Sequence, residues 1–172
     1  MKTKLLAITA AICAAAALLS FTACGDGNES ENSGKIEHGY SICYAFTAED
    51  SLMPAGTPSM YDYMRALKDN DMLDFESSES DYGAFIISVM GVSTRTVSES
   101  YSDDFAHGSW KGYSWMVYTT VTLYDGTPYA DTDISFEYNG VTLYQSAYGV
   151  SGIPCVKGES YALVYEYSET SF

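Results

Sequence analysis

Apolar residues recur at every second position in several stretches of the chain, and this alternation limits the fold more than any other feature. The stretch 40–46 alternates Tyr, Ile, Tyr and Phe with Ser, Cys and Ala, which is the period of a strand with one buried face. The stretches 84–90, 113–123 and 160–167 are rich in the aromatic, aliphatic and β-branched residues that strands favour. We therefore expect at least five or six strands.

One pair of strands is predicted to form a tight hairpin. The segments 134–138 and 141–144 flank an Asn-Gly pair at 139–140, which suits a type I′ turn because both residues tolerate positive φ. An Asp-Gly pair at 125–126 marks a second turn. The segment 93–112 is richer in Ser, Asp and Gly, and we expect a loop there.

A single helix is predicted to begin after Thr57-Pro58-Ser59. Thr57 or Ser59 can cap a helix, and proline suits the first helical turn. The residues that follow place an apolar stripe at helical spacing, formed by Met60, Tyr63, Met64 and Leu67. One helix packed on a sheet of at least five strands gives the expected fold class, α+β.

The start of the chain has the features of a bacterial lipoprotein signal. Two lysines precede an apolar run at 5–19, which is shorter than the roughly 20 residues of a membrane span. Small residues then lead to Cys24. We expect residues 1–23 to be removed and Cys24 to carry lipid, which would anchor the protein on the outer side of the bacterial cell membrane. An ordinary secretory signal with an incidental cysteine is the alternative, and it also places the protein outside the cytoplasm.

The charge of the exported chain excludes several classes of partner. Loss of residues 1–23 removes two lysines and no acidic residue, so the formal charge changes from −15 to −17. Nucleic acid and anionic lipid head groups are therefore poor partners. Residues 24–39 are polar and acidic, and we expect a flexible tether there. Residues 40–172 are long enough for one domain, and the 16 tyrosines favour a binding surface.

The sequence leaves open how Cys43 and Cys155 are used. Cys13 lies in the leader and Cys24 is the expected lipid site, so these two remain. One disulfide that joins an early strand to a late segment suits an oxidising compartment, and two buried thiols are the alternative. The choice depends on a Cα separation that the sequence does not give.

We find no positive sign of catalysis in the sequence. The two histidines are His38 in the tether and His107 in the expected loop, so His107 lacks a neighbouring histidine as a second metal ligand. Serines are abundant, but no nucleophile elbow, zinc-protease motif or phosphate-binding loop is present. We expect a protein that is not an enzyme and has no metal site and no cofactor.

Four short motifs carry a family resemblance. They are Tyr-Gly-Ala-Phe-Ile-Ile-Ser-Val-Met-Gly at 82–91, Tyr-Ser-Trp-Met-Val at 113–117, Tyr-Gly-Val at 148–150 and Gly-Glu at 158–159. In this order the chain resembles the small C-terminal domain of transcobalamin and intrinsic factor, to which domains of bacterial surface lipoproteins are related. The resemblance implies a β-grasp-like fold, with one helix packed on a mixed or antiparallel sheet. Residues 119–144 would then be an insertion that adds a β-hairpin.

The resemblance also implies a ligand site. In that family the turn that matches 148–150 lies at the face of bound cobalamin, so Tyr148, Gly149 and Val150 are expected to bind ligand. Trp115 and Tyr113 are further ligand-binding candidates. Gly149 would allow close approach of a ligand to the backbone, and a tight loop without ligand is the alternative. Trp115 is equally explained as a core residue.

The expected function is that of a lipid-anchored extracytoplasmic binding protein. It would capture cobalamin, another corrinoid or another soluble ligand, and pass it to a transporter. The alternative is a cell-surface module that binds a protein or a glycan through the tyrosines of the inserted hairpin, namely Tyr124, Tyr129, Tyr138 and Tyr144. A concave apolar pocket beneath Tyr148 would favour a small ligand, and a flat exposed aromatic patch would favour a protein partner.

Overall fold

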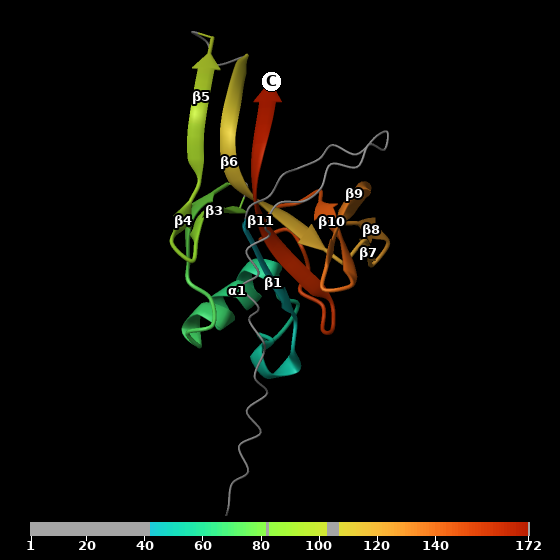
Figure 1. The fold of residues 1–172 in the computed structure, drawn as a ribbon. Coiled ribbons are helices and arrows are strands. Elements are labelled where there is room, and N and C mark those ends of the chain that lie inside the picture. Colours follow the sequence, from blue (N-terminus) through green and yellow to red (C-terminus); the bar gives the residue numbers. More distant parts are fainter. Residues whose placement is uncertain (1–41, 82, 103–106, 172) are drawn as a thin grey trace, which may run out of the picture.

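Strands make up 58% of the structure and helix only 10%. The structure is a computed structural model that describes residues 42–81, 83–102 and 107–171 (Figure 1). Its helical elements are the single turn η1 (Asp50–Leu52) and the helix α1 (Met60–Asp69). The strands are β1 (Ile42–Thr47), β2 (Phe75–Ser80), β3 (Gly83–Val89), β4 (Val92–Ser93), β5 (Arg95–Tyr101), β6 (Gly108–Thr119), β7 (Leu123–Tyr124), β8 (Thr127–Pro128), β9 (Ala130–Tyr138), β10 (Val141–Ser146) and β11 (Ser160–Ser171).

The fold is nearly all β, so the prediction of an α+β, β-grasp-like fold is wrong. Besides two-residue strands, the alternation of apolar residues misses β2 and β5, and β5 lies in the segment expected to be a loop. Every residue of β5 is exposed, and Phe75 is the one buried residue of β2. Neither strand therefore has the periodic burial that marks a strand in a sequence. Both are strands because their backbones pair with a neighbour, β5 with β6 and β2 with β3.

Two long antiparallel strands, β6 and β11, form the centre of the main sheet. They pair from Tyr161 opposite Thr119 to Ser171 opposite Ser109. The sheet has the order β1-β11-β6-β10-β9, and β5 also pairs with β6. β10 pairs with the last two residues of β6, whereas β5 pairs with the first half of β6. The two ends of the β6–β11 pair therefore have different neighbours.

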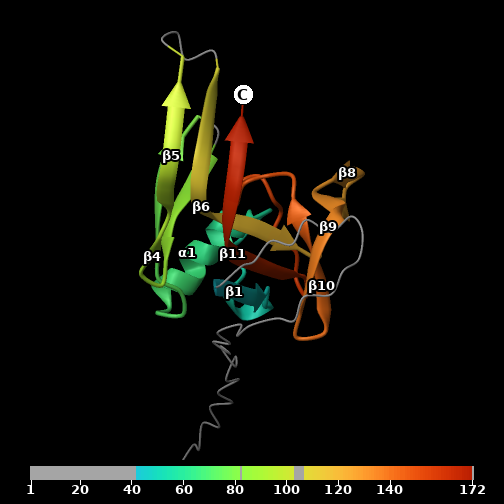
Figure 2. The ribbon, with the colours of Figure 1, turned by 45° about the horizontal axis from the view of Figure 1, so that its top comes forward.

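One end of this pair is packed and the other end is exposed. At the packed end β1 lies beside β11, and residues 161–164 of β11 are fully buried. At the other end the last residues of β11 extend past β1 and are largely exposed. Figures 1 and 2 show β5, β6 and the end of β11 projecting from the body of the molecule. We call these three strand segments, residues 95–101, 108–113 and 167–171, the arm.

The helix α1 covers one face of the body, and its details agree with the sequence prediction. Ser59 is the cap: its hydroxyl accepts a hydrogen bond from the Asp62 N–H, and the Asp62 carboxylate accepts one from the Ser59 N–H. The predicted apolar stripe is buried, and it consists of Met60, Tyr63, Met64 and Leu67. It belongs to the same core as the side chains that β6 and β11 direct to this face of the sheet.

The β9–β10 hairpin packs against the other face. Its turn has positive φ at both Asn139 (50°) and Gly140 (77°), so the predicted type I′ hairpin is confirmed. Leu143 of β10 joins Val164 of β11 in a second, smaller core. The Asp-Gly pair at 125–126 forms the turn between β7 and β8, as predicted.

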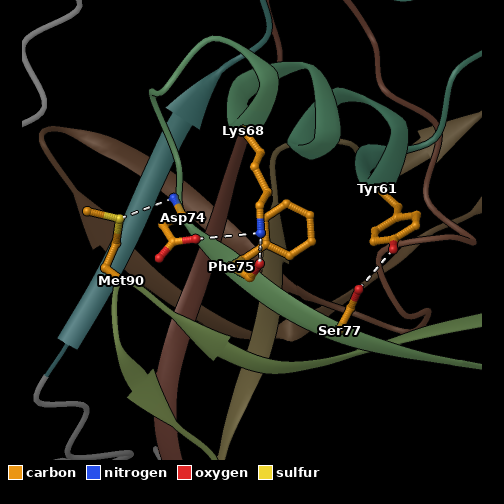
Figure 3. A network of polar contacts seen from close by, with 6 residues as sticks. All are labelled: Tyr61, Lys68, Asp74, Phe75, Ser77 and Met90. Atoms are coloured by element: carbon orange, nitrogen blue, oxygen red, sulfur yellow. Dashed lines mark hydrogen bonds and ion pairs between the residues drawn. The ribbon is translucent and has the colours of Figure 1, made fainter.

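The small sheet β2-β3-β4 lies beside α1. Phe75, Ile86 and Val89 of this sheet belong to the same core as the buried stripe of the helix. β2 is an end strand of the sheet, and α1 directs polar side chains toward it (Figure 3). Within the described part of the chain, no helix is long and apolar enough to cross a membrane.

Candidate functional site

A groove of about 290 Å³ opens beside β1, which is an end strand of the main sheet. β1 forms one part of its lining, and Glu49, η1, α1 and Met72 form a second part. The tip of the β9–β10 hairpin forms a third part. The lining is mostly aromatic and aliphatic, and it includes Tyr44, Phe46, Leu52, Tyr63, Val141 and Leu143. Segments that are far apart in the sequence thus meet at one edge of the sheet.

Packed aromatic rings hold the β1 side of the groove in place. The Phe46 ring stacks on both Tyr63 of α1 and Tyr161 of β11, with ring centroids 5.4 and 5.6 Å apart. Tyr44 is buried, and its hydroxyl donates a hydrogen bond to the Met72 carbonyl (2.9 Å). These contacts leave the rings few alternative rotamers. The groove is therefore formed before any ligand arrives, which lowers the entropic cost of binding.

Polar groups of the groove lie at its rim and along the edge of β1. The Tyr63 hydroxyl accepts a hydrogen bond from the Glu49 N–H (2.9 Å). Among the lining residues Glu49 carries the one formal charge, and none of them is basic. Among the described strands β1 pairs only with β11, so its other side is an outer edge of the described sheet. The arrangement suits an apolar ligand that can hydrogen-bond to backbone and that is neutral or positively charged.

Two of the residues expected to bind ligand lie in the core instead. Val150 is 1% exposed, and its carbonyl accepts a hydrogen bond from the N–H of Tyr61 in α1 (3.0 Å). Trp115 is 6% exposed, and its indole N–H donates a hydrogen bond to the Val92 carbonyl (3.0 Å). Both side chains therefore contribute packing, and Trp115 also ties β6 to the small sheet.

The other two residues of the expected ligand turn are at the surface. Tyr148 is 44% exposed, and its ring lies 5.2 Å from that of Tyr129. Gly149 is exposed, and its φ lies outside the left-handed region, so the backbone there does not require glycine. Neither the groove beside β1 nor the depression between α1 and β2 described below is lined by residues 148–150.

Tyr113 forms part of a row of rings at the base of the arm. It stacks on Tyr165 with a centroid separation of 5.5 Å and lies edge-on to Tyr167 at 5.3 Å. The Arg95 guanidinium lies 5.0 Å from the centre of the Tyr113 ring. Tyr165 also contacts Trp115. The structure thus joins Tyr113 and Trp115 through Tyr165, in a row that holds β5, β6 and β11 together.

The two cysteines of the domain lie on opposite faces of the main sheet. Cys43 packs in the smaller core with Val164, whereas Cys155 belongs to the larger core with α1. No disulfide joins Cys43 to Cys155. Cys155 is buried and Cys43 is partly buried.

The tyrosines of the expected protein-binding hairpin do not form a single patch. Tyr138 lines the groove beside β1, whereas Tyr129 contacts Tyr148 at the turn. His107 is exposed, and its backbone N–H donates a hydrogen bond to the Ser102 hydroxyl (3.0 Å). Among the described residues, no group of three or more His, Cys, Asp or Glu side chains could hold a metal ion.

The sequence predicts the strand and the helix that carry several residues of the groove, but it does not predict the groove itself. The alternation at 40–46 places Tyr44 and Phe46 on a strand, and the helical stripe includes Tyr63. No local signal shows that β1 is an end strand, because that follows from its pairing with β11, more than a hundred residues later. The hairpin tip reaches the groove through the same long-range arrangement.

The chain matches no family model, no curated protein and no solved structure. The resemblance to the transcobalamin C-terminal domain therefore stays a prediction.

We expect the stability of the protein to fall in alkaline solution. Burial, and then the neighbouring Tyr63, raise the pKa of Tyr44 from 10.0 to about 12, and burial raises the pKa of the Cys155 thiol from 9.0 to about 12. The folded state keeps these protons to a higher pH than the unfolded state does. The free energy of unfolding should therefore be insensitive to these groups below about pH 9 and should decrease from there to about pH 12.

Urea denaturation between these two pH values measures the effect. Tyr44→Phe should show a shallower decrease above about pH 10 than the unchanged chain, because one of the late-ionising phenols is gone. Equal slopes in the two proteins would contradict the burial of Tyr44.

Proposed function

We propose that this chain is a lipid-anchored extracytoplasmic binding protein, without enzyme activity, whose groove beside β1 receives an extended peptide segment of a partner protein. The observation that carries the proposal is an aromatic-lined groove at a strand that pairs on one side only among the described strands. An extended segment can add to such an edge through backbone hydrogen bonds while every second side chain enters the groove.

The size of the groove favours side chains over a large planar ligand. Its volume of about 290 Å³ lies at the low end of the range for pockets that enclose drug-sized molecules. One or two bulky apolar side chains suit this space, and the partly exposed rings of Phe46 and Tyr138 in its lining offer them apolar contact. A corrin is a broad plate fringed with amides and would extend well beyond the groove.

Charge favours a neutral or basic partner segment. Glu49 is the one charged lining residue, and the exported chain has a formal charge of −17. A field of this sign raises the rate at which a cationic segment meets the protein and lowers that rate for an acidic one. The contacts at the groove then determine how long the segment stays bound.

Selection from a display library of random peptides on the purified full-length lipoprotein, held in neutral detergent, tests the proposal. We expect the enriched peptides to alternate bulky apolar residues with neutral or basic ones and to bind less tightly at high salt. Cyanocobalamin is titrated in parallel, because the resemblance to transcobalamin implies a corrinoid at Tyr148 and Gly149.

A pair of variants separates the groove from the rest of the surface. Val141→Lys places a charge at the groove, where Val141 is 39% exposed, and should weaken peptide binding at least about tenfold, or about 1.4 kcal/mol. Val97→Lys makes the same change on β5 of the arm, where Val97 is 54% exposed, and should leave binding unchanged. The peptide proposal fails if both variants bind equally, or if no peptide is enriched and cyanocobalamin binds.

The anchor is tested separately in cells. Cys24→Ala removes the sulfur that would carry lipid, so the exported protein should move from the membrane fraction to the soluble fraction. Metabolic labelling with an alkyne fatty acid should mark the unchanged chain and not the variant. A variant that stays in the membrane fraction and keeps its label would contradict lipidation at Cys24.

A further inference from the structure

The helix α1 lines a second hollow on its other side. Tyr61, Arg65 and Lys68 recur at a spacing of four and three residues, which places them on one face of the helix. This face meets β2, and the depression between them is lined also by Phe75, Ser77, Ile87 and Glu76. The groove beside β1 is lined instead by Tyr63 and Leu67 of the same helix, so the two hollows are separate.

Three contacts fix the walls of this depression, and all are visible in Figure 3. The Lys68 ammonium group donates a hydrogen bond to the Phe75 carbonyl (2.5 Å) and lies 3.5 Å from the Asp74 carboxylate. The hydroxyls of Tyr61 and Ser77 lie 2.8 Å apart. The helix and the end strand β2 are thus held at a fixed separation with polar groups between them.

The hydroxyls of Tyr61 and Ser77 together have one hydrogen that their mutual hydrogen bond does not use. Either oxygen can be the donor in the contact between Tyr61 and Ser77. A contact between two hydroxyls uses one of their two hydrogens, so the other hydrogen is left to donate elsewhere. An oxygen of a bound anion can accept it.

Arg65 is the residue that gives the depression its chemistry. In the described part of the chain its guanidinium takes part in no ion pair, although the chain is strongly acidic. Asp62 on the first turn is bound by the N–H and hydroxyl of Ser59, and the charge of Arg65 acts on it without an ion-pair contact. Glu76 also lines the depression, and Lys68 is already paired with Asp74, so Arg65 is the lining cation that has no ion pair in the described part of the chain.

We propose that this depression binds an oxyanion, a carboxylate or a phosphate group, with Arg65 as the bidentate donor and the Tyr61–Ser77 hydroxyl pair as the second donor. A guanidinium presents two parallel N–H groups that match the oxygens of either group. Lys68 adds positive charge from the wall without leaving its bonds to β2. The site goes beyond the peptide groove, and binding at one does not require binding at the other.

The chain contains two arginines, Arg65 and Arg95, which makes the test direct. The Nε–Hε signals of the full-length lipoprotein in neutral detergent are followed by NMR during titration with inorganic phosphate and, separately, with acetate. The variants Arg65→Gln and Arg95→Gln assign the two signals and change the net charge equally. We expect the Arg65 signal to shift saturably in the millimolar range and the Arg95 signal not to do so.

Comparison of the titrations with phosphate and acetate identifies the class of ligand. Saturation with only one of them identifies phosphate or carboxylate as the preferred group, and either result supports the site. The double variant Tyr61→Phe with Ser77→Ala keeps the ring against Phe75 and removes both hydroxyls, so it should weaken binding several-fold while the Arg65 signal still responds. The proposal is overturned if neither anion saturates the Arg65 signal, or if both arginine signals shift alike.

Discussion

The pairing of β6 with β11 is the contact on which the rest of the molecule depends. These strands pair along most of their length, but only the half around Tyr161 is buried on both faces. Burial of that half brings α1 to one face and the β9–β10 hairpin to the other. β1 then adds at the outer side of β11, so the groove beside β1 exists because three distant segments meet at one pair of strands. The other half extends into solvent as the arm (Figure 1).

The helix α1 gives this β structure two different surfaces. Its buried stripe is apolar and includes Tyr63, which stacks on Phe46 at the groove. The face that carries Tyr61 and Arg65 meets the end strand β2 through polar contacts. One short helix thus separates an apolar hollow, suited to side chains of a partner, from a polar hollow that contains Arg65, suited to an oxyanion. The two proposed sites differ in chemistry because the two faces of the helix do.

Local patterns predict the elements that bury a face or require a particular turn, and they fail for the others. The stripe from Met60 to Leu67 and the Asn-Gly turn are both confirmed, because burial and positive φ leave local marks in the sequence. β2 and β5 carry no such mark, since they are exposed strands held by backbone pairing, and without them the fold looks like α+β. The environment of the expected site residues shows the same limit: Val150 and Trp115 are apolar residues at motif positions, and only long-range packing shows that they face the core. The residues of β1 also do not indicate that it is an end strand of the sheet.

Native-state hydrogen exchange of the protein tests the central division between a packed body and an exposed arm most directly. Amides of β11 at 161–164, and of β6 opposite them, should exchange only through global unfolding. Amides of β5 in the arm should exchange through local opening, on the order of a hundredfold or more faster. Equal protection of β5 and of residues 161–164 would show that the arm is not separate from the body, and fast exchange at 161–164 would show that the β6–β11 pair is not the centre of the fold.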